Sequence, residues 1–235
     1  MSQKLTPACR LKIVKKLNFA QNQLTMEQRK IEVARQLLAI NTIKIQPDAP
    51  FSWASGWKAP IYCDNRKILS YPATRTFICK AFSELVREKY PDAEAIAGVA
   101  TGAIAHGVLV AEALGLPFIY IRSAPKGHGL ENLIEGDIPQ GTKTVIIEDL
   151  VSTGTSSLNA AQAVRNYGAE VLGMLAIFTY NFPHASANFE NAKIELTTLS
   201  NYNVLLKLAH DSGEINDKQL ASLNNWRKTP ETWGR

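Results

Sequence analysis

The feature that most constrains the fold is an alternation of apolar stretches and helix-like segments between residues 95 and 180. The apolar stretches lie at 95–99, 117–121, 144–147 and 171–180, and the helix-like segments at 104–114 and 156–167. Such alternation is typical of βαβ units, which build a parallel sheet covered by helices. The sequence therefore predicts an α/β domain whose ligands bind at the carboxyl ends of the strands.

The flanking regions predict smaller elements around that sheet. We expect helices at 27–40 and 72–89, strands at 42–45 and 61–64, and an appended strand at 194–196 followed by two short helices. Residues 123–142 are polar and rich in glycine, and a loop of that length inside a compact domain is often an active-site lid. The expected organisation is one domain over 26–235, with the C-terminal appendage at 195–235.

Charge is concentrated at the N-terminus. Residues 1–25 carry five lysines and arginines and no acid, which accounts for the whole net charge of +5. The remainder is formally neutral, which argues against a uniformly basic nucleic-acid-binding protein. The basic segment could be a targeting or membrane-surface helix, but we expect a disordered extension or a start codon placed upstream of the true one at Met26.

Hydropathy and cysteine content exclude other classes. No apolar run of about 18 residues occurs, so no transmembrane helix is expected. The three cysteines lack CxxC spacing, which argues against a zinc site or disulfide framework and suits a reducing, cytoplasmic location.

The segment 144–156 carries the chemistry. An apolar strand ends in Glu148 and Asp149, and a turn of Ser, Thr and Gly then opens a helix, whose N-terminal amides can bind a phosphate. The two acids would repel that phosphate and instead need hydroxyl donors or a cation. A phosphorylated ribose near hydrated Mg²⁺ therefore fits both the acids and the turn. The alternative is an ordinary strand followed by a capped helix. The predicted ribose-phosphate residues are Glu148, Asp149, Leu150, Val151, Ser152, Thr153, Gly154, Thr155 and Ser156.

Four segments resemble those of the type I phosphoribosyltransferases, which bind 5-phosphoribosyl-1-diphosphate. Residues 144–156 resemble the family's ribose-phosphate signature, and 98–103 its diphosphate loop. Residues 51–66 and 122–129 resemble the base-binding segment and the mobile catalytic loop of the orotate branch. The resemblance covers about residues 27–233 and implies the type I phosphoribosyltransferase fold, with a central parallel sheet flanked by helices and a small N-terminal base-binding hood at about 26–70.

The resemblance also implies a reaction, in which orotate and phosphoribosyl diphosphate give orotidine 5′-monophosphate and diphosphate during pyrimidine (UMP) biosynthesis. The enzyme would be a pentosyltransferase that depends on Mg²⁺, with the ion held by substrate and water near the acids rather than directly by the protein. Partners would be the two substrates and a second copy of the chain, in a homodimer with shared active sites, without nucleic acid or membrane.

Residue roles follow from the same resemblance. Arg122, Lys126 and His128 would be catalytic and contact the phosphoribosyl diphosphate, together with Thr101, Gly102 and Lys58. Orotate would contact Ser152, Lys58, Phe51 and Tyr62.

This sequence departs from the family at three points. Ser123 stands where many members have a lysine, Thr101–Gly102 where many have a tyrosine–lysine pair, and residues 178–181 lack the arginine that some members use for orotate. Two alternatives stay open. One is a phosphoribosyltransferase acting on a purine or uracil, and the other is a transcriptional regulator that binds phosphoribosyl diphosphate on the same fold.

Overall fold

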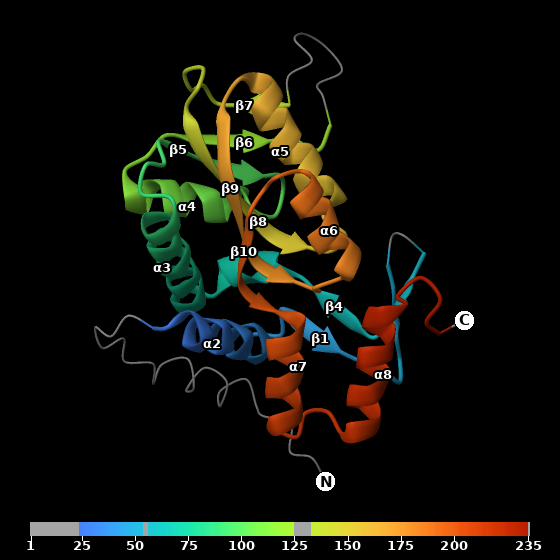
Figure 1. The fold of residues 1–235 in the computed structure, drawn as a ribbon. Coiled ribbons are helices and arrows are strands. Elements are labelled where there is room, and N and C mark those ends of the chain that lie inside the picture. The colour runs from blue at the N-terminus through green and yellow to red at the C-terminus, as the bar shows by residue number, and fades with distance from the viewer. Residues whose placement is uncertain (1–23, 54–55, 125–132, 235) are drawn as a thin grey trace.

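A six-stranded sheet forms the centre of the molecule, with strand order β10-β9-β8-β5-β6-β7. The computed structural model describes residues 24–53, 56–124 and 133–234 (Figure 1). The strands are β5 (Ala95–Val99), β6 (Phe118–Ile121), β7 (Ile134–Glu135), β8 (Lys143–Val151), β9 (Glu170–Thr179) and β10 (Leu196–Asn201). Every pair of neighbours is parallel except β6 and β7. The predicted parallel α/β sheet is confirmed, with one short antiparallel edge strand added.

Helices cover both faces of this sheet (Figure 1). They are α3 (Pro72–Lys89) and α4 (Ile104–Leu114) on one side, and α5 (Thr155–Tyr167) and α6 (Pro183–Asn191) on the other. All five residues of β5 are buried, as expected of a central strand covered on both faces. Gly115 and Gly168 end α4 and α5 in the left-handed conformation, which glycine adopts without steric cost.

An N-terminal hood lies against the sheet and is built from short elements. These are α2 (Met26–Ala39), β1 (Ile43–Ile45), β2 (Phe51–Ser52), β3 (Lys58–Ala59), β4 (Ile61–Cys63) and the 3₁₀ helix η1 (Asn65–Ser70). β1 pairs with β4 and β2 with β3, both antiparallel. Buried Arg29 of α2 bonds Glu84 and Glu88 of α3 at 3.2 and 3.3 Å, which fastens the hood to the sheet layer.

The C-terminal appendage consists of α7 (Tyr202–Asp211) and α8 (Asp217–Lys228), which lie beside the hood (Figure 1). Asn201 caps α7, and Asn216 forms a capping box with Gln219 at the start of α8. Trp226 of α8 is fully buried, and its indole N–H donates to the carbonyl of Lys58 in β3 at 3.2 Å. The appendage is therefore part of the folded domain and packs against the hood.

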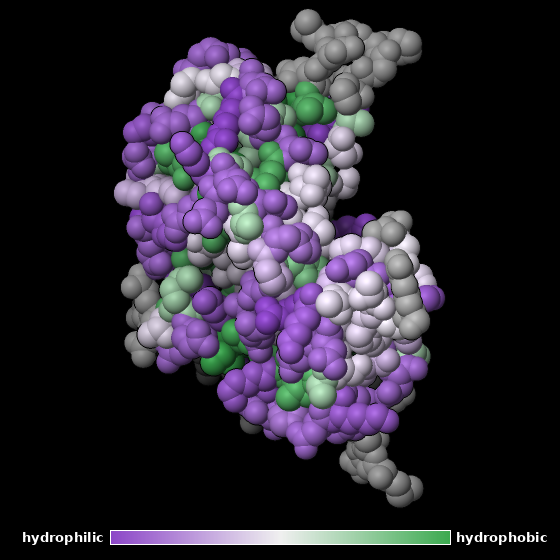
Figure 2. All heavy atoms as spheres, turned by 45° about the vertical axis from the view of Figure 1, so that its right-hand side comes forward, coloured by the Kyte–Doolittle hydropathy of each residue, from purple (hydrophilic) through white to green (hydrophobic). Residues whose placement is uncertain are grey.

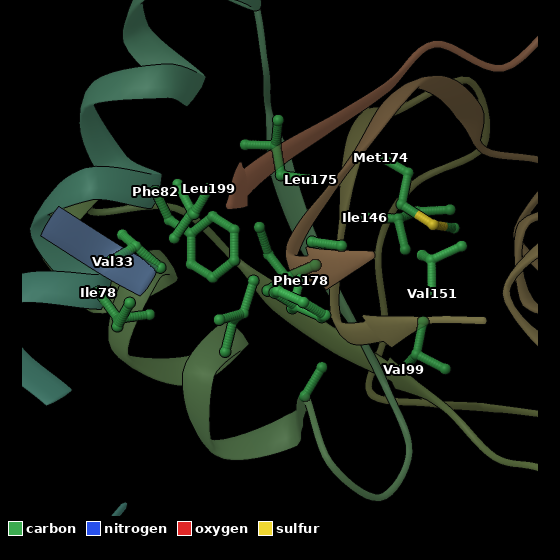
Figure 3. Close-up of a cluster of buried hydrophobic side chains, with 14 of the residues drawn as sticks. Val33, Ile78, Phe82, Val99, Ile146, Val151, Met174, Leu175, Phe178 and Leu199 are labelled. Carbon is green, nitrogen blue, oxygen red and sulfur yellow. The ribbon is translucent and has the colours of Figure 1, made fainter. Parts of the chain in front are cut away.

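One hydrophobic core joins these layers. Figure 3 shows Val33 of α2 near Phe82 and Ile78 of α3, with Leu199 of β10 and Phe178 of β9 beside them. The surface seen in Figure 2 is mostly hydrophilic, with hydrophobic residues in small separate areas. Within the described ranges, no helix has the length and apolar character needed to span a membrane.

Four boundaries differ from the sequence-based expectations. β8 continues through Glu148 and Asp149 to Val151, because its pairing with β9 continues beyond the acids. The expected loop at 123–142 contains β7, the last strand spans 196–201 instead of 194–196, and α6 was not predicted. α6 holds a single large apolar side chain, Phe189, among small and polar ones, so the sequence shows no apolar helical face there. The N-terminal segment 1–23 lies outside the described residues.

Candidate active site at the carboxyl edge of the sheet

The two acids of β8 face different surroundings. Glu148 is 4% exposed; its Oε2 accepts a hydrogen bond from Ser157 Oγ and its Oε1 accepts one from the backbone N–H of Asp149, both at 2.9 Å. Burial, and then the charge of Asp149, raise the pKa of Glu148 to about 8. The structure thus places Glu148 inside the protein, where it joins β8 to α5, while Asp149 is only partly buried.

Asp149 lies against the loop that follows β5. A Cβ atom at Gly102 would be 2.2 Å from Asp149 Oδ2, so only glycine allows this close approach. Burial raises the pKa of the Asp149 carboxyl, while Glu148 and the charge of Arg66 oppose the rise. The backbone N–H of Ala100 donates to the carbonyl of Ile121 at 2.8 Å, so Arg122 follows directly beside this loop. The structure therefore brings the predicted ribose, diphosphate and Arg122 segments to one edge.

The turn between β8 and α5 is shaped to receive an anion. Gly154 has φ +85° and precedes the first residue of α5, and no side chain caps that helix. Its first amide N–H groups thus have no partner within the helix, and the helix dipole adds positive potential there. α6 supports the turn, because Asn188 Nδ2 donates to the carbonyl of Thr153 at 3.3 Å and the ring of Phe189 lies against Gly154.

The remaining predicted members of the turn differ in access. Thr155 and Ser156 are exposed at the start of α5, and Ser152 is half-buried. Val151 is fully buried, so only its backbone could reach a ligand.

A pocket of about 440 Å³ adjoins this turn. Its lining residues are Ser52, Trp53, Trp57, Tyr62, Cys63, Leu150, Ser152, Thr153 and Tyr180. Aromatic and apolar walls with a few hydroxyl groups suit a flat ring that makes a small number of hydrogen bonds. The pocket includes Ser152 and Thr153 of this turn, so one ligand could place a ring in the pocket and an anionic group on the turn.

The residues predicted to contact the base lie at or next to this pocket. Tyr62 and Ser152 line it. Phe51 packs on Tyr62 with ring centroids 5.6 Å apart. Lys58 is exposed, and its Nζ donates to Ser52 Oγ at 2.9 Å, so this cation lies at the rim.

Five lining residues were not predicted: Ser52, Trp53, Trp57, Cys63 and Tyr180. Trp53 packs at 5.1 Å on Tyr180, and Trp226 meets Trp53 edge-on at 5.5 Å. Burial raises the pKa values of Cys63 and Tyr180, so both stay neutral at physiological pH. The available signal was the Pro, Gly and aromatic content of residues 47–60, but only the fold shows that Tyr180 joins them.

The predicted catalytic cations are only partly described. Arg122 Nη1 is 3.5 Å from Glu135 Oε1 of β7, in a half-buried ion pair. Lys126 and His128 lie outside the described residues. Residues 178–181, at the end of β9, include no basic side chain, but α8 supplies one from elsewhere in the chain. Arg227 Nη1 of α8 donates to the carbonyl of Asn181 at 3.1 Å.

The donor set bears on how Mg²⁺ could be bound. Over the described ranges, no group of three or more His, Cys, Asp or Glu side chains gathers in a way that could hold a metal ion. Asp149 nevertheless offers a carboxylate oxygen beside Gly102, in the loop that follows β5, and Mg²⁺ favours oxygen ligands while keeping several waters. These residues fit an ion that arrives with a phosphorylated substrate.

Comparison with known proteins agrees with this geometry. A phosphoribosyl transferase domain is matched over residues 67–199. Orotate phosphoribosyltransferase of Porphyromonas gingivalis is 56% identical over 202 residues, covering 86% of this chain and 96% of its own. That of Streptococcus mutans is 52% identical and covers 86% of this chain and 97% of its own.

Solved structures share the fold. UMP synthase of Leishmania donovani superposes with a TM-score of 0.73 at 25% identity, over 86% of this chain and 43% of its own. Orotate phosphoribosyltransferase of Aeropyrum pernix gives a TM-score of 0.68 at 23% identity, over 78% of this chain and 99% of its own.

Proposed function

Because this chain belongs to the orotate phosphoribosyltransferase family, we propose that the site at the carboxyl edge of its sheet transfers the phosphoribosyl group from phosphoribosyl diphosphate to orotate. The observation that carries the assignment of roles is the adjacency of three parts: the aromatic pocket, the uncapped N-terminus of α5 and the carboxylate of Asp149. In this arrangement the base enters the pocket, the 5′-phosphate binds residues 152–156, and Asp149 accepts hydrogen bonds from the ribose hydroxyls.

No protein nucleophile is required, because a nitrogen of orotate attacks C1 of the ribose while diphosphate leaves. The chain contributes positioning and charge stabilisation. The amides of Thr101 and Gly102 and the guanidinium of Arg122 bind the departing diphosphate, and Lys126 and His128 close over it. Mg²⁺, when bound with the substrate near Asp149, supplies further neutralisation of the diphosphate charge.

The lining of the pocket suits the flat ring of a pyrimidine. Tyr62 and Trp53 provide faces for stacking, and Ser152 provides a hydroxyl to a polar edge of the ring. Lys58 at the rim supplies a positive charge toward the carboxylate of orotate, and Phe51 supports Tyr62. Arg227 is a second cation close to the end of β9, in a region where residues 178–181 have no basic side chain.

We further propose a homodimer in which the segment 123–142 of one subunit reaches the site of the other. Mixing Lys126→Ala with Asp149→Asn subunits tests it, because a shared site would regain one intact centre in each mixed dimer. A cytoplasmic location suits the free thiols of Cys63 and Cys79, which a reducing compartment would keep from oxidation.

The test of the reaction is an absorbance assay for loss of orotate in the presence of phosphoribosyl diphosphate. Orotate should be consumed only with Mg²⁺ present, while uracil and adenine should not be converted. Conversion of uracil or adenine at a rate similar to orotate would contradict the base assignment. Tight binding of phosphoribosyl diphosphate without turnover of any base would contradict the assignment of enzymatic activity.

A further inference from the structure

β8 runs past the end of its neighbour β5 at the point where it carries the acids. The pairing of β8 with β5 stops at Ile147, opposite Gly98, whereas its pairing with β9 continues to Val151, opposite Thr179. Asp149 therefore has a strand on one side only. Buried backbone groups must find partners elsewhere when the ladder ends, or the structure loses the free energy of those hydrogen bonds.

A side chain from the hood takes the place of the missing strand. Asn65 Nδ2 donates to the backbone carbonyl of Asp149 at 2.6 Å, across 84 positions of sequence. Asn65 is 1% exposed and begins η1 directly after β4. The backbone N–H of Asp149 in turn donates to Glu148 Oε1 at 2.9 Å. On the side where β5 has ended, the main chain of Asp149 is thus held by side chains in place of a strand.

The other end of the Asn65 amide contacts a residue that lines the base pocket. Cys63, which lines that pocket, donates its thiol to Asn65 Oδ1 at 3.3 Å. Because one amide bonds both Cys63 and Asp149, its donor and acceptor atoms can be assigned: Nδ2 must face the carbonyl and Oδ1 the thiol. The neighbouring Arg66 also acts on Asp149, through its charge.

From these contacts we infer that Asn65 is a positioning residue of the reaction: it sets the place of the Asp149 carboxylate relative to the base pocket by holding the Asp149 main chain from the hood. Its own side chain is buried and needs no contact with substrate. The inference rests on the proposed role of Asp149 in binding the ribose, and adds the device that holds it.

The test compares binding of phosphoribosyl diphosphate to the wild-type protein and to Asn65→Leu and Asn65→Asp, by isothermal titration with Mg²⁺. Asn65→Leu keeps much of the volume and removes the donor. Asn65→Asp keeps the shape but sets an acceptor against the Asp149 carbonyl. Both should raise the Kd about tenfold or more, the scale of one lost hydrogen bond in a buried site. The KM for phosphoribosyl diphosphate should rise in parallel, with a smaller change in kcat.

Thr42→Val is the matched control. Thr42 is also 1% exposed, lies in the hood, and donates Oγ1 to the carbonyl of Leu37 at 2.6 Å. Thr42→Val loses a buried side-chain hydrogen bond to a backbone carbonyl, as Asn65→Leu does, but away from Asp149. It should therefore lower the melting temperature to a similar extent and leave the Kd for phosphoribosyl diphosphate within about twofold of wild type. If Asn65→Leu fails to fold, Asn65→Ser replaces it, because the serine hydroxyl is too short to reach the carbonyl and should raise the Kd equally.

The outcomes separate this inference from the proposed reaction. If wild type binds phosphoribosyl diphosphate and consumes orotate, but the folded Asn65 variants bind as tightly as wild type, the inference is overturned and the reaction stands. An equal rise in Kd for Thr42→Val would also overturn it, because the effect would then reflect general loosening of the hood. Failure of the wild-type protein itself to bind the substrate would refute the proposed function.

Discussion

Replacing Gly102 with alanine tests the ribose-binding role of Asp149 without changing any charge. The new Cβ would lie 2.2 Å from Oδ2 and 2.4 Å from Cγ of Asp149, whereas ordinary contact begins near 3.4 Å. The carboxylate must therefore move by about 1 Å, which is enough to lose well-aligned hydrogen bonds to the ribose hydroxyls. Hydrogen bonds to a charged group contribute about 1.5–3 kcal/mol each, so losing about 3 kcal/mol in all predicts a rise of about 100-fold in KM for phosphoribosyl diphosphate.

The product nucleotide separates this effect from damage to the diphosphate loop. Orotidine 5′-monophosphate carries the ribose hydroxyls but no diphosphate, so Gly102→Ala should weaken its binding as well. Gly115→Ala is the control: φ is +68° and no atom lies within 4 Å of the added Cβ, so it strains the backbone and lowers the melting temperature without raising KM. A folded Gly102→Ala protein whose KM stays within about twofold of wild type would refute the placement of the ribose.

Four further outcomes are expected. Asp149→Asn should weaken binding of phosphoribosyl diphosphate more than binding of orotate, and calorimetry giving the reverse order would contradict the ribose role. Lys126→Ala should reduce kcat by about 10²–10³, the scale of one oxyanion-type donor, with little change in melting temperature; an unaltered kcat would contradict its catalytic role. Folding raises the pKa of Glu148 from 4.5 to about 8, so the protonated carboxyl stabilises the folded protein fully below pH 4.5 and this stabilisation is lost as the pH rises through about 8. Glu148→Gln should therefore flatten the decline in melting temperature between pH 4.5 and about 8. Deletion of residues 1–25 should leave turnover intact, which initial-rate assays can check.

Periodicity and local chemistry predicted much of the fold. The strands at 95–99 and 118–121 and the helices at 72–89 and 104–114 match the structure closely, because each has an apolar pattern that its own segment determines. The end of β8 was harder, since strand pairing with β9 continues through two acids that resemble a strand terminus. α6 was missed because its role is to support another turn rather than to bury a broad apolar face of its own.

The site, like the fold, has parts that the local sequence indicates and parts that depend on tertiary packing. Asp149 and the glycine-containing turn could be proposed from the sequence because their residue types already indicate a chemistry, and the structure places both at one sheet edge. The separate roles of Glu148 and Asp149 could not, since alternating directions along a strand and the position of Ser157 determine which acid is buried. Nor could the contribution of Tyr180, because its place in the pocket depends on how the hood packs on the end of β9.

The packing of Trp226 against Trp53 has a consequence for synthesis of the protein. The indole bonds Lys58 across 168 positions, so the nascent chain carries the first half of this contact long before the ribosome adds the second. A premature stop codon just before α8 would keep all of 144–156 and still remove Trp226, which packs against Trp53. The aromatic wall is therefore completed only after α8 has been synthesised, later than the turn at residues 152–156.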